Sequence, residues 1–177
     1  MSLLVNIPTI ITFSRILLIP LFIFVVKTKP LLGALVFVLA SATDLLDGYI
    51  ARKSKQVTKL GVLLDPLADK LLVISALIVF VDMEVIPAWI AIVIITREFV
   101  VTGLRIVALS KDIIIPAEMG GKVKTITQFV SIFILLTDRL HINLDLYASG
   151  VALLWISMLI GIASGIQYFI SFWRRLS

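Results

Sequence analysis

The sequence predicts an all-α, polytopic membrane protein with six transmembrane helices in one bundle, as a single domain over residues 1–177. The chain has 177 residues, 60% of them hydrophobic, and a mean hydropathy of +1.15. A soluble domain of this size does not need so much apolar surface. The apolar residues form six segments, each close to the roughly 20 residues that a bilayer crossing requires. Most charged residues lie in the short stretches between them, and no long linker divides the chain.

The first three segments are close together in the chain. The first, at about 8–27, contains Arg15, so we expect this helix to tilt near the interface or to keep Arg15 inside the bundle. It begins without a basic leader or a small-residue cleavage site, which argues against a signal peptide. The second and third, at about 31–52 and 60–81, are joined by the short basic connection ARKSKQVTK. We therefore expect these two helices to be antiparallel neighbours.

The last three segments continue the same pattern. The fourth lies at about 86–108, and the stretch SKDIIIPAEMGGK separates it from the fifth, at about 122–138. The sixth, at about 146–172, contains Gly161-x-x-x-Gly165. This spacing of small residues lets another helix approach closely, either within the bundle or from a second copy of the chain.

The cations divide unequally between the two ends of these segments. Under the positive-inside rule the richer end faces the cytoplasm, so we expect both termini there. The formal net charge of +5 suits an anionic bilayer surface or an anionic substrate. The broad basic face of a soluble nucleic-acid-binding module is not visible. One end carries only Lys27, Lys29 and Arg139, and the other carries Arg52, Lys53, Lys55, Lys59, Arg105, Lys111, Lys122, Lys124, Arg174 and Arg175.

Four aspartates lie in an otherwise largely apolar region, in the stretch SATDLLDGYIARKSKQVTKLGVLLDPLADK. Asp44 and Asp47 are three residues apart, and Asp65 and Asp69 are four apart, so each pair shares one face of its helix. Carboxylates are costly in such surroundings unless they have partners. Because the two helices are expected to be neighbours, the four carboxylates can together hold two divalent cations.

The chemistry of this stretch favours magnesium or manganese. Both ions prefer oxygen ligands, whereas zinc is not expected because the chain has no cysteine and its one histidine, His141, lies at the opposite end. Two such ions can clamp a pyrophosphate and neutralise the leaving group. Gly48 and Gly61 leave room for a ligand, and Arg52 can reach a phosphate. The alternative is a set of helix-end charges paired with the basic connection, but four acids at these spacings are uncommon there.

The stretch follows the pattern D-x2-D-G-x2-A-R-x8-G-x3-D-x3-D and resembles the signature of the CDP-alcohol phosphotransferase family. The resemblance implies a six-helix integral membrane enzyme, commonly a homodimer, that moves a phosphatidyl or similar group from a CDP-linked donor to an alcohol and releases CMP. It also implies that the aspartates bind two metals and the donor's diphosphate, with Asp69 as the general base, and that Gly48, Ala51 and Gly61 shape the cytidine site. The matching positions are Asp44, Asp47, Gly48, Ala51, Arg52, Gly61, Asp65 and Asp69.

The acceptor is indicated by the flanking sequence. NIPTIITFSRILLIP, REFVVTGLR and GKVKT resemble bacterial members of the family that use sn-glycerol 3-phosphate. This acceptor is a dianion near neutral pH, so its site needs cations. The cations near the cytoplasmic helix ends can instead be membrane anchors. The buried Arg97 can instead belong to a structural ion pair. We expect its neighbour Glu98 to face away from it. The candidates for the acceptor phosphate are Arg15, Arg97, Arg105, Lys122 and Lys124.

These observations predict a magnesium-dependent enzyme of the bacterial cytoplasmic membrane, with its active site facing the cytoplasm. Its donor would be CDP-diacylglycerol and its acceptor sn-glycerol 3-phosphate. One alternative keeps this chemistry but uses phosphatidylglycerol, inositol phosphate or serine as the acceptor. Another is a cation transporter with the acidic cluster as its ion site, but that explains neither the glycines nor Arg52. Lys70, which follows Asp69, is expected to form a structural ion pair.

Overall fold

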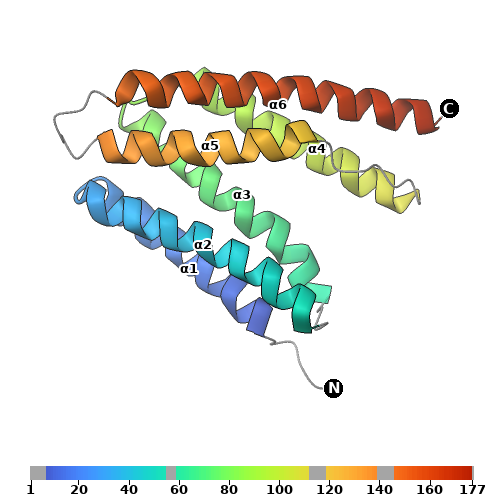
Figure 1. Cartoon of the computed structure of the whole chain (residues 1–177), viewed down its shortest axis with the longest axis horizontal. Coiled ribbons are helices and arrows are strands. Elements are labelled where there is room, and N and C mark those ends of the chain that lie inside the picture. Colours follow the sequence, from blue (N-terminus) through green and yellow to red (C-terminus); the bar gives the residue numbers. More distant parts are fainter. Residues whose placement is uncertain (1–6, 55–58, 112–118, 139–145, 177) are drawn as a thin grey trace.

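The computed structural model describes a bundle of α-helices (Figure 1). It describes the backbone of residues 7–54, 59–111, 119–138 and 146–176, and the side chains of residues 14, 16–43, 70–111, 119–138 and 146–175. No strand occurs in these parts of the chain. The helices are α1 (Ile7–Val26), α2 (Pro30–Ser54), α3 (Lys59–Asp82), α4 (Ala88–Ser110), α5 (Met119–Asp138) and α6 (Tyr147–Leu176). Each overlaps one of the six predicted segments, so the all-helical prediction is confirmed.

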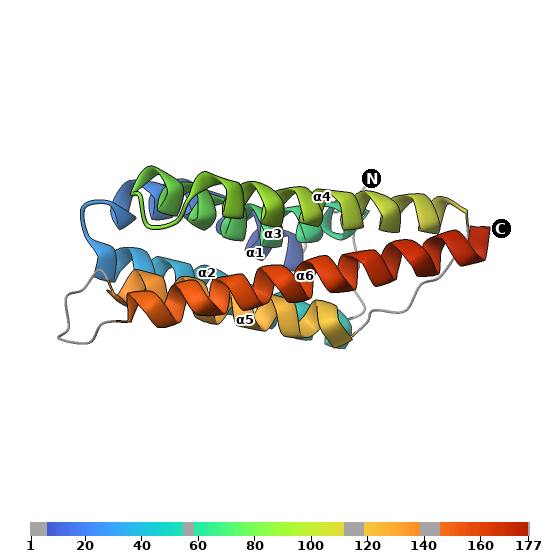
Figure 2. The same cartoon turned by 90° about the horizontal axis from the view of Figure 1, so that it is seen from above.

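The helices run alternately up and down, so successive helices are antiparallel. Figure 1 shows the start of α1, the end of α2, the start of α3 and the end of α6 toward the same end of the bundle. The most extensive pairing joins α5 to α6, and α1 packs on α2 and α3. Seen from above, α4 lies on one side of the bundle with α5 and α6 on the other (Figure 2). As expected, α2 contacts α3.

Local sequence explains how the first hairpin closes. Pro30 begins α2. Proline lacks a backbone N–H, and this costs nothing here because the N–H groups of the first helical turn have no carbonyl partner within the helix. Gly33 then lies against the end of α1, since an added Cβ would come within 2.7 Å of the Val26 Cα. Only glycine allows the two backbones to approach this closely.

The distribution of apolar side chains is that of a membrane protein. Phe22, Phe37 and Phe80 are fully buried in the core, whereas Leu17 and Phe24 are about three-quarters exposed, at 74% and 78%. Large exposed apolar surfaces are unusual for a soluble monomer but natural against lipid.

Two helices, Met119–Asp138 and Tyr147–Arg175, are long and apolar enough to cross a bilayer in the part of the chain that the structure describes. In α4, Arg97, Glu98 and Arg105 interrupt the apolar run. The expectation of six spans with cytoplasmic termini stays a prediction.

The orientation can be tested directly because the chain contains no cysteine. Thr28 lies in the exposed turn between α1 and α2, and Ser110 is the exposed last residue of α4. In intact bacterial cells we expect Thr28→Cys to react with a membrane-impermeant maleimide and Ser110→Cys to react only after permeabilisation. The opposite labelling pattern would show that the termini lie outside the cell.

Candidate active site

The aspartate motif is carried by α2 and α3, whose motif-bearing ends lie together in Figure 1. Helix α2 contributes Asp44, Asp47, Gly48, Ala51 and Arg52, and α3 contributes Gly61, Asp65 and Asp69. The side chains of these residues, and that of Arg15 on α1, lie outside the described ones. Their predicted meeting around two metal ions therefore stays a prediction. A metal site shared by these side chains requires that α2 and α3 be in contact, and they are.

Beside this motif, a cavity of about 490 Å³ opens between α3, α4, α5 and α6. Lys70 lines the cavity and directly follows Asp69 in α3. Consecutive Cα atoms are about 3.8 Å apart, so the backbone of Asp69 is one residue from the cavity wall. Among the described side chains, four cations, one carboxylate and several hydroxyl groups line the space: Lys70, Arg97, Arg105, Lys122, Glu98, Thr102, Thr125, Ser164 and Tyr168.

Glu98 is the centre of an ion-pair network at the inner wall of this cavity. Its Oε1 lies 3.0 Å from Arg97 Nη1 and also pairs with Lys124 Nζ from α5. The prediction that Glu98 faces away from Arg97 is therefore wrong. Neighbouring residues on a helix point about a quarter-turn apart, but both side chains are long enough to meet. Their surroundings favour the pairing, since an unpaired charge would be costly there.

Arg97 also connects α4 to α6. Its Nε donates to the Gly161 carbonyl and its Nη2 donates to Ser164 Oγ, both at 2.8 Å. A Cβ added at Gly161 would lie 3.7 Å from Arg97 Nε, and one at Gly165 would lie 3.6 Å from Arg97 Cγ. The two glycines therefore make room for the Arg97 side chain between α4 and α6. This is the packing within the bundle that was one of the two interpretations of the Gly161-x-x-x-Gly165 spacing.

The predicted acceptor-site cations have different surroundings. Arg97, Arg105 and Lys122 line the large cavity together, and Arg105 lies 6.0 Å above the Tyr168 ring. Lys124 is only 4% exposed and lines two smaller spaces beside this cavity. Arg105 and Lys122 thus offer exposed charges to a ligand, whereas Arg97 and Lys124 are already bound to Glu98.

Sequence reasoning did not predict that Lys70 lines the cavity. Lys70 also donates a hydrogen bond to Thr102 Oγ1 on α4. The available signal was its position, since a lysine next to the last motif aspartate is close to the same site. Glu98 carried a similar signal, because a single carboxylate among several intramembrane cations is their natural counter-ion.

The network makes a stability prediction. Removing one partner of a buried ion pair leaves an uncompensated charge and costs about 3–5 kcal/mol. We expect Glu98→Gln to lower the melting temperature of the detergent-solubilised protein substantially. Adding Lys124→Met should recover part of the loss, because it removes the charge left unpaired on α5.

The matched control is Asp82→Asn, which breaks the Lys27–Asp82 pair between side chains that are 48% and 56% exposed. Exposed pairs contribute about 0–1 kcal/mol, so this variant should melt near the wild-type temperature. Equal melting temperatures for Glu98→Gln and the wild type would contradict the proposed importance of the buried network.

Comparison with known proteins identifies the family of this chain. The family model for CDP-alcohol phosphatidyltransferase matches residues 5–163. A protein of Bacillus subtilis (strain 168) is 41% identical over 187 residues, covering 97% of each chain. A protein of Rickettsia bellii (strain RML369-C) is 41% identical, with 93% of each chain covered, and one of Escherichia coli (strain K12) is 35% identical, with 92% covered.

All three relatives bear the name CDP-diacylglycerol–glycerol-3-phosphate 3-phosphatidyltransferase. The aspartate pattern, the helical membrane bundle and the match over most of its length agree: this chain belongs to the CDP-alcohol phosphatidyltransferase family.

Proposed function

We propose that this chain transfers the phosphatidyl group from CDP-diacylglycerol to sn-glycerol 3-phosphate, giving phosphatidylglycerophosphate and CMP. The similarity to enzymes named for this reaction extends over more than nine-tenths of the chain and supports both substrates. The reaction would take place at the cytoplasmic face of the bacterial membrane. A homodimer surrounded by membrane lipids would carry it out.

The cavity beside the aspartate motif is the observation that carries the choice of acceptor. Among the described residues that line it, four cations outnumber one carboxylate, a surplus of three positive charges. A phosphate monoester carries about −1.5 to −2 charge at neutral pH. A neutral acceptor such as serine or inositol would not need this surplus. We therefore assign the acceptor phosphate to this cavity.

The cations of the cavity have distinct roles in this proposal. Arg105 and Lys122 contact the phosphate, because both are exposed and line the cavity. Lys70 lines the same cavity from α3. Arg97 and Lys124 raise the positive potential from the inner wall, where charges act strongly on one another. Arg15 on α1 remains a further candidate for the same phosphate.

The donor set of the motif fits magnesium, with manganese as an alternative. Asp44, Asp47, Asp65 and Asp69 supply carboxylate oxygens, and no cysteine is present to favour a softer metal. These residues would hold two ions, which when bound neutralise charge on the diphosphate and on the departing CMP.

The remaining steps are performed by the protein side chains. Gly48, Ala51 and Gly61 leave space for the cytidine diphosphate, and Arg52 holds a phosphate. Asp69 accepts the proton of the primary hydroxyl of the acceptor, whose oxygen attacks the phosphorus bearing the diacylglycerol. CMP leaves in the same displacement, and the acyl chains stay in the bilayer. Asp69 is suited to this task because its neighbour Lys70 lines the acceptor cavity.

The decisive experiment is CMP release by the purified protein with CDP-diacylglycerol and magnesium. sn-Glycerol 3-phosphate, inositol phosphate, serine and phosphatidylglycerol are offered one at a time. We expect turnover with sn-glycerol 3-phosphate alone, and its loss when magnesium is chelated. Asp69→Asn should lower kcat by about 10²–10⁴-fold, the usual contribution of a general base. Turnover with a different acceptor would overturn the acceptor assignment but keep the reaction class.

A paired substitution tests the cavity itself. Arg105→Gln should raise KM for sn-glycerol 3-phosphate about tenfold, as expected for one lost charge-assisted contact. Lys111→Gln is the control, since Lys111 is an exposed cation just after α4 that does not line the cavity. If both variants change KM equally, the effect comes from general surface charge, and the cavity is not the phosphate site.

A further inference from the structure

A hydrogen bond between two side chains joins α3 to α4 at the wall of the large cavity. Lys70 on α3 donates this bond, and Thr102 Oγ1 on α4 accepts it. Both residues line the cavity, and Lys70 directly follows Asp69 in the chain. The bond therefore connects the helix that carries the last motif aspartate to the helix that carries Arg105, a proposed ligand of the acceptor phosphate.

The hydroxyl group of Thr102 is oriented to accept a hydrogen bond from Lys70. It donates its own hydrogen to the Glu98 carbonyl, one turn earlier in α4, at 2.6 Å. A hydroxyl group has one hydrogen to donate and two lone pairs that accept, whereas an ammonium group can only donate. The bond within α4 therefore leaves the lone pairs of Oγ1 for Lys70. A hydrogen bond from a charged donor is also stronger than a neutral one.

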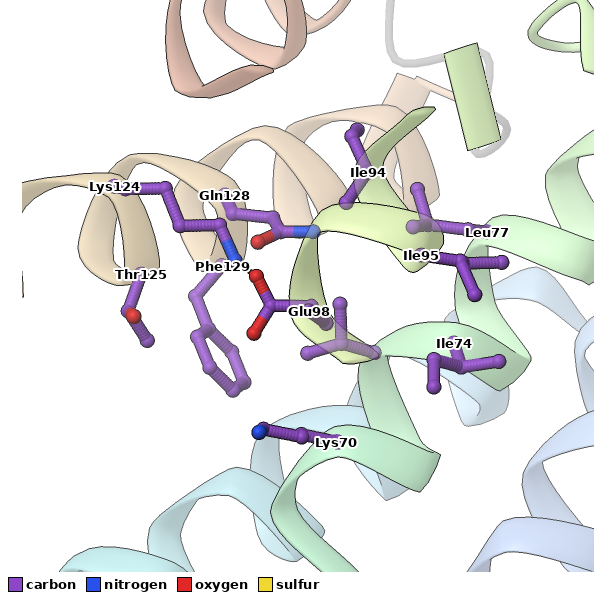
Figure 3. A pocket seen from close by; sticks show the side chains of 11 residues that line it. Lys70, Ile74, Leu77, Ile94, Ile95, Glu98, Lys124, Thr125, Gln128 and Phe129 are labelled. Atoms are coloured by element: carbon purple, nitrogen blue, oxygen red, sulfur yellow. Dashed lines mark hydrogen bonds and ion pairs between the residues drawn. The ribbon is translucent and has the colours of Figure 1, made fainter. Parts of the chain in front are cut away.

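This bond matters because a lysine side chain is not held in place by its backbone alone. Its charge lies at the end of a flexible four-carbon stem. Figure 3 shows the Lys124 ammonium group beside the Glu98 carboxylate, and the Lys70 ammonium group apart from that carboxylate. Thr102 gives Lys70 a partner on α4, so the charge stays at the cavity wall and α3 stays linked to α4.

We propose that Thr102 is a positioning residue for the phosphatidyl transfer, and that its bond to Lys70 sets the position of Asp69 relative to the acceptor. The proposal rests on the function proposed above. Asp69 and Lys70 are consecutive in α3, so a displacement of one displaces the other. A misplacement of about 1 Å in reacting groups can lower the rate about 10²-fold. Thr102 acts through Lys70 and not by contact with the reacting atoms.

The test separates the hydroxyl group of Thr102 from its shape. Thr102→Val keeps the branched side chain and loses the hydroxyl, whereas Thr102→Ser keeps the hydroxyl. The measurement is CMP release by the full-length protein with CDP-diacylglycerol, magnesium and sn-glycerol 3-phosphate. We expect Thr102→Val to lower kcat/KM for the acceptor about tenfold, and Thr102→Ser to stay within about threefold of the wild type. KM for CDP-diacylglycerol should change less than about threefold in both variants.

A double substitution tests whether Thr102 acts through Lys70. Lys70→Met removes the donor of the bond. In this background Thr102→Val should lower kcat/KM by less than about twofold, because residues that act as one unit are not additive. Where Lys70→Met leaves too little CMP release to compare, the difference between Thr102→Ser and Thr102→Val decides alone. Thr102→Ala replaces Thr102→Val if the latter does not fold.

Thr127→Val is the matched control. The Thr127 hydroxyl on α5 bonds the Val123 carbonyl of its own helix, as Thr102 bonds Glu98, but Thr127 does not line the cavity. The control therefore loses the same kind of bond within a helix and keeps the link between α3 and α4. It should leave kcat/KM and both KM values near those of the wild type.

Three outcomes would overturn the proposal. The first is a Thr102→Val protein with wild-type kinetics. The second is an equal loss in Thr102→Ser and Thr102→Val, which would mean that packing matters and the hydroxyl does not. The third is an additive loss in the double variant, which would show that Thr102 acts without Lys70. A wild-type protein that releases no CMP with sn-glycerol 3-phosphate would instead refute the proposed function.

Discussion

The carboxylate of Glu98 is the interaction on which the cavity depends. Two cations, Arg97 and Lys124, approach its Oε1 from two different helices. Without this negative charge, the two cations would repel each other in surroundings where water screens poorly. A carboxylate between two cations converts that repulsion into a link between α4 and α5. The link spans helices whose backbones otherwise make no close contact, so the space between them can stay open for a ligand.

Arg97 extends this link to α6, and small residues make the extension possible. Its guanidinium group uses one nitrogen for Glu98 and two for the carbonyl of Gly161 and the hydroxyl of Ser164. The planar group is thereby held in one orientation, since three nitrogens have fixed partners. Glycine at 161 and 165 gives the side chain room to cross α6. One arginine therefore positions the wall of the cavity, and in the proposed site its charge would add to the positive potential without being the primary ligand of the acceptor.

The sequence predicted the helices well because apolar length and charged interruptions are local signals. Each of the six segments corresponds to an observed helix within a few residues. The motif and the basic candidates Arg97, Arg105 and Lys122 were also found from spacing and position. The partnership of Glu98 was missed because periodicity gives the direction of the Cβ atom, whereas long side chains bend toward the nearest opposite charge.

Helix α3 joins the two halves of the proposed chemistry. The acidic half belongs to α2 and the first part of α3, where the aspartates occur. The basic half belongs to α4, α5 and α6, where the cavity lies. Asp69 and Lys70 are the adjacent residues at which the two halves meet, and Lys70 is fixed to α4 through Thr102. A proton acceptor at Asp69 would then have a constant position relative to a phosphate bound in the cavity. In the proposed site, this division would let a donor bound through metal ions and an anionic acceptor lie side by side, because separate sets of cations would balance the negative charge of each substrate.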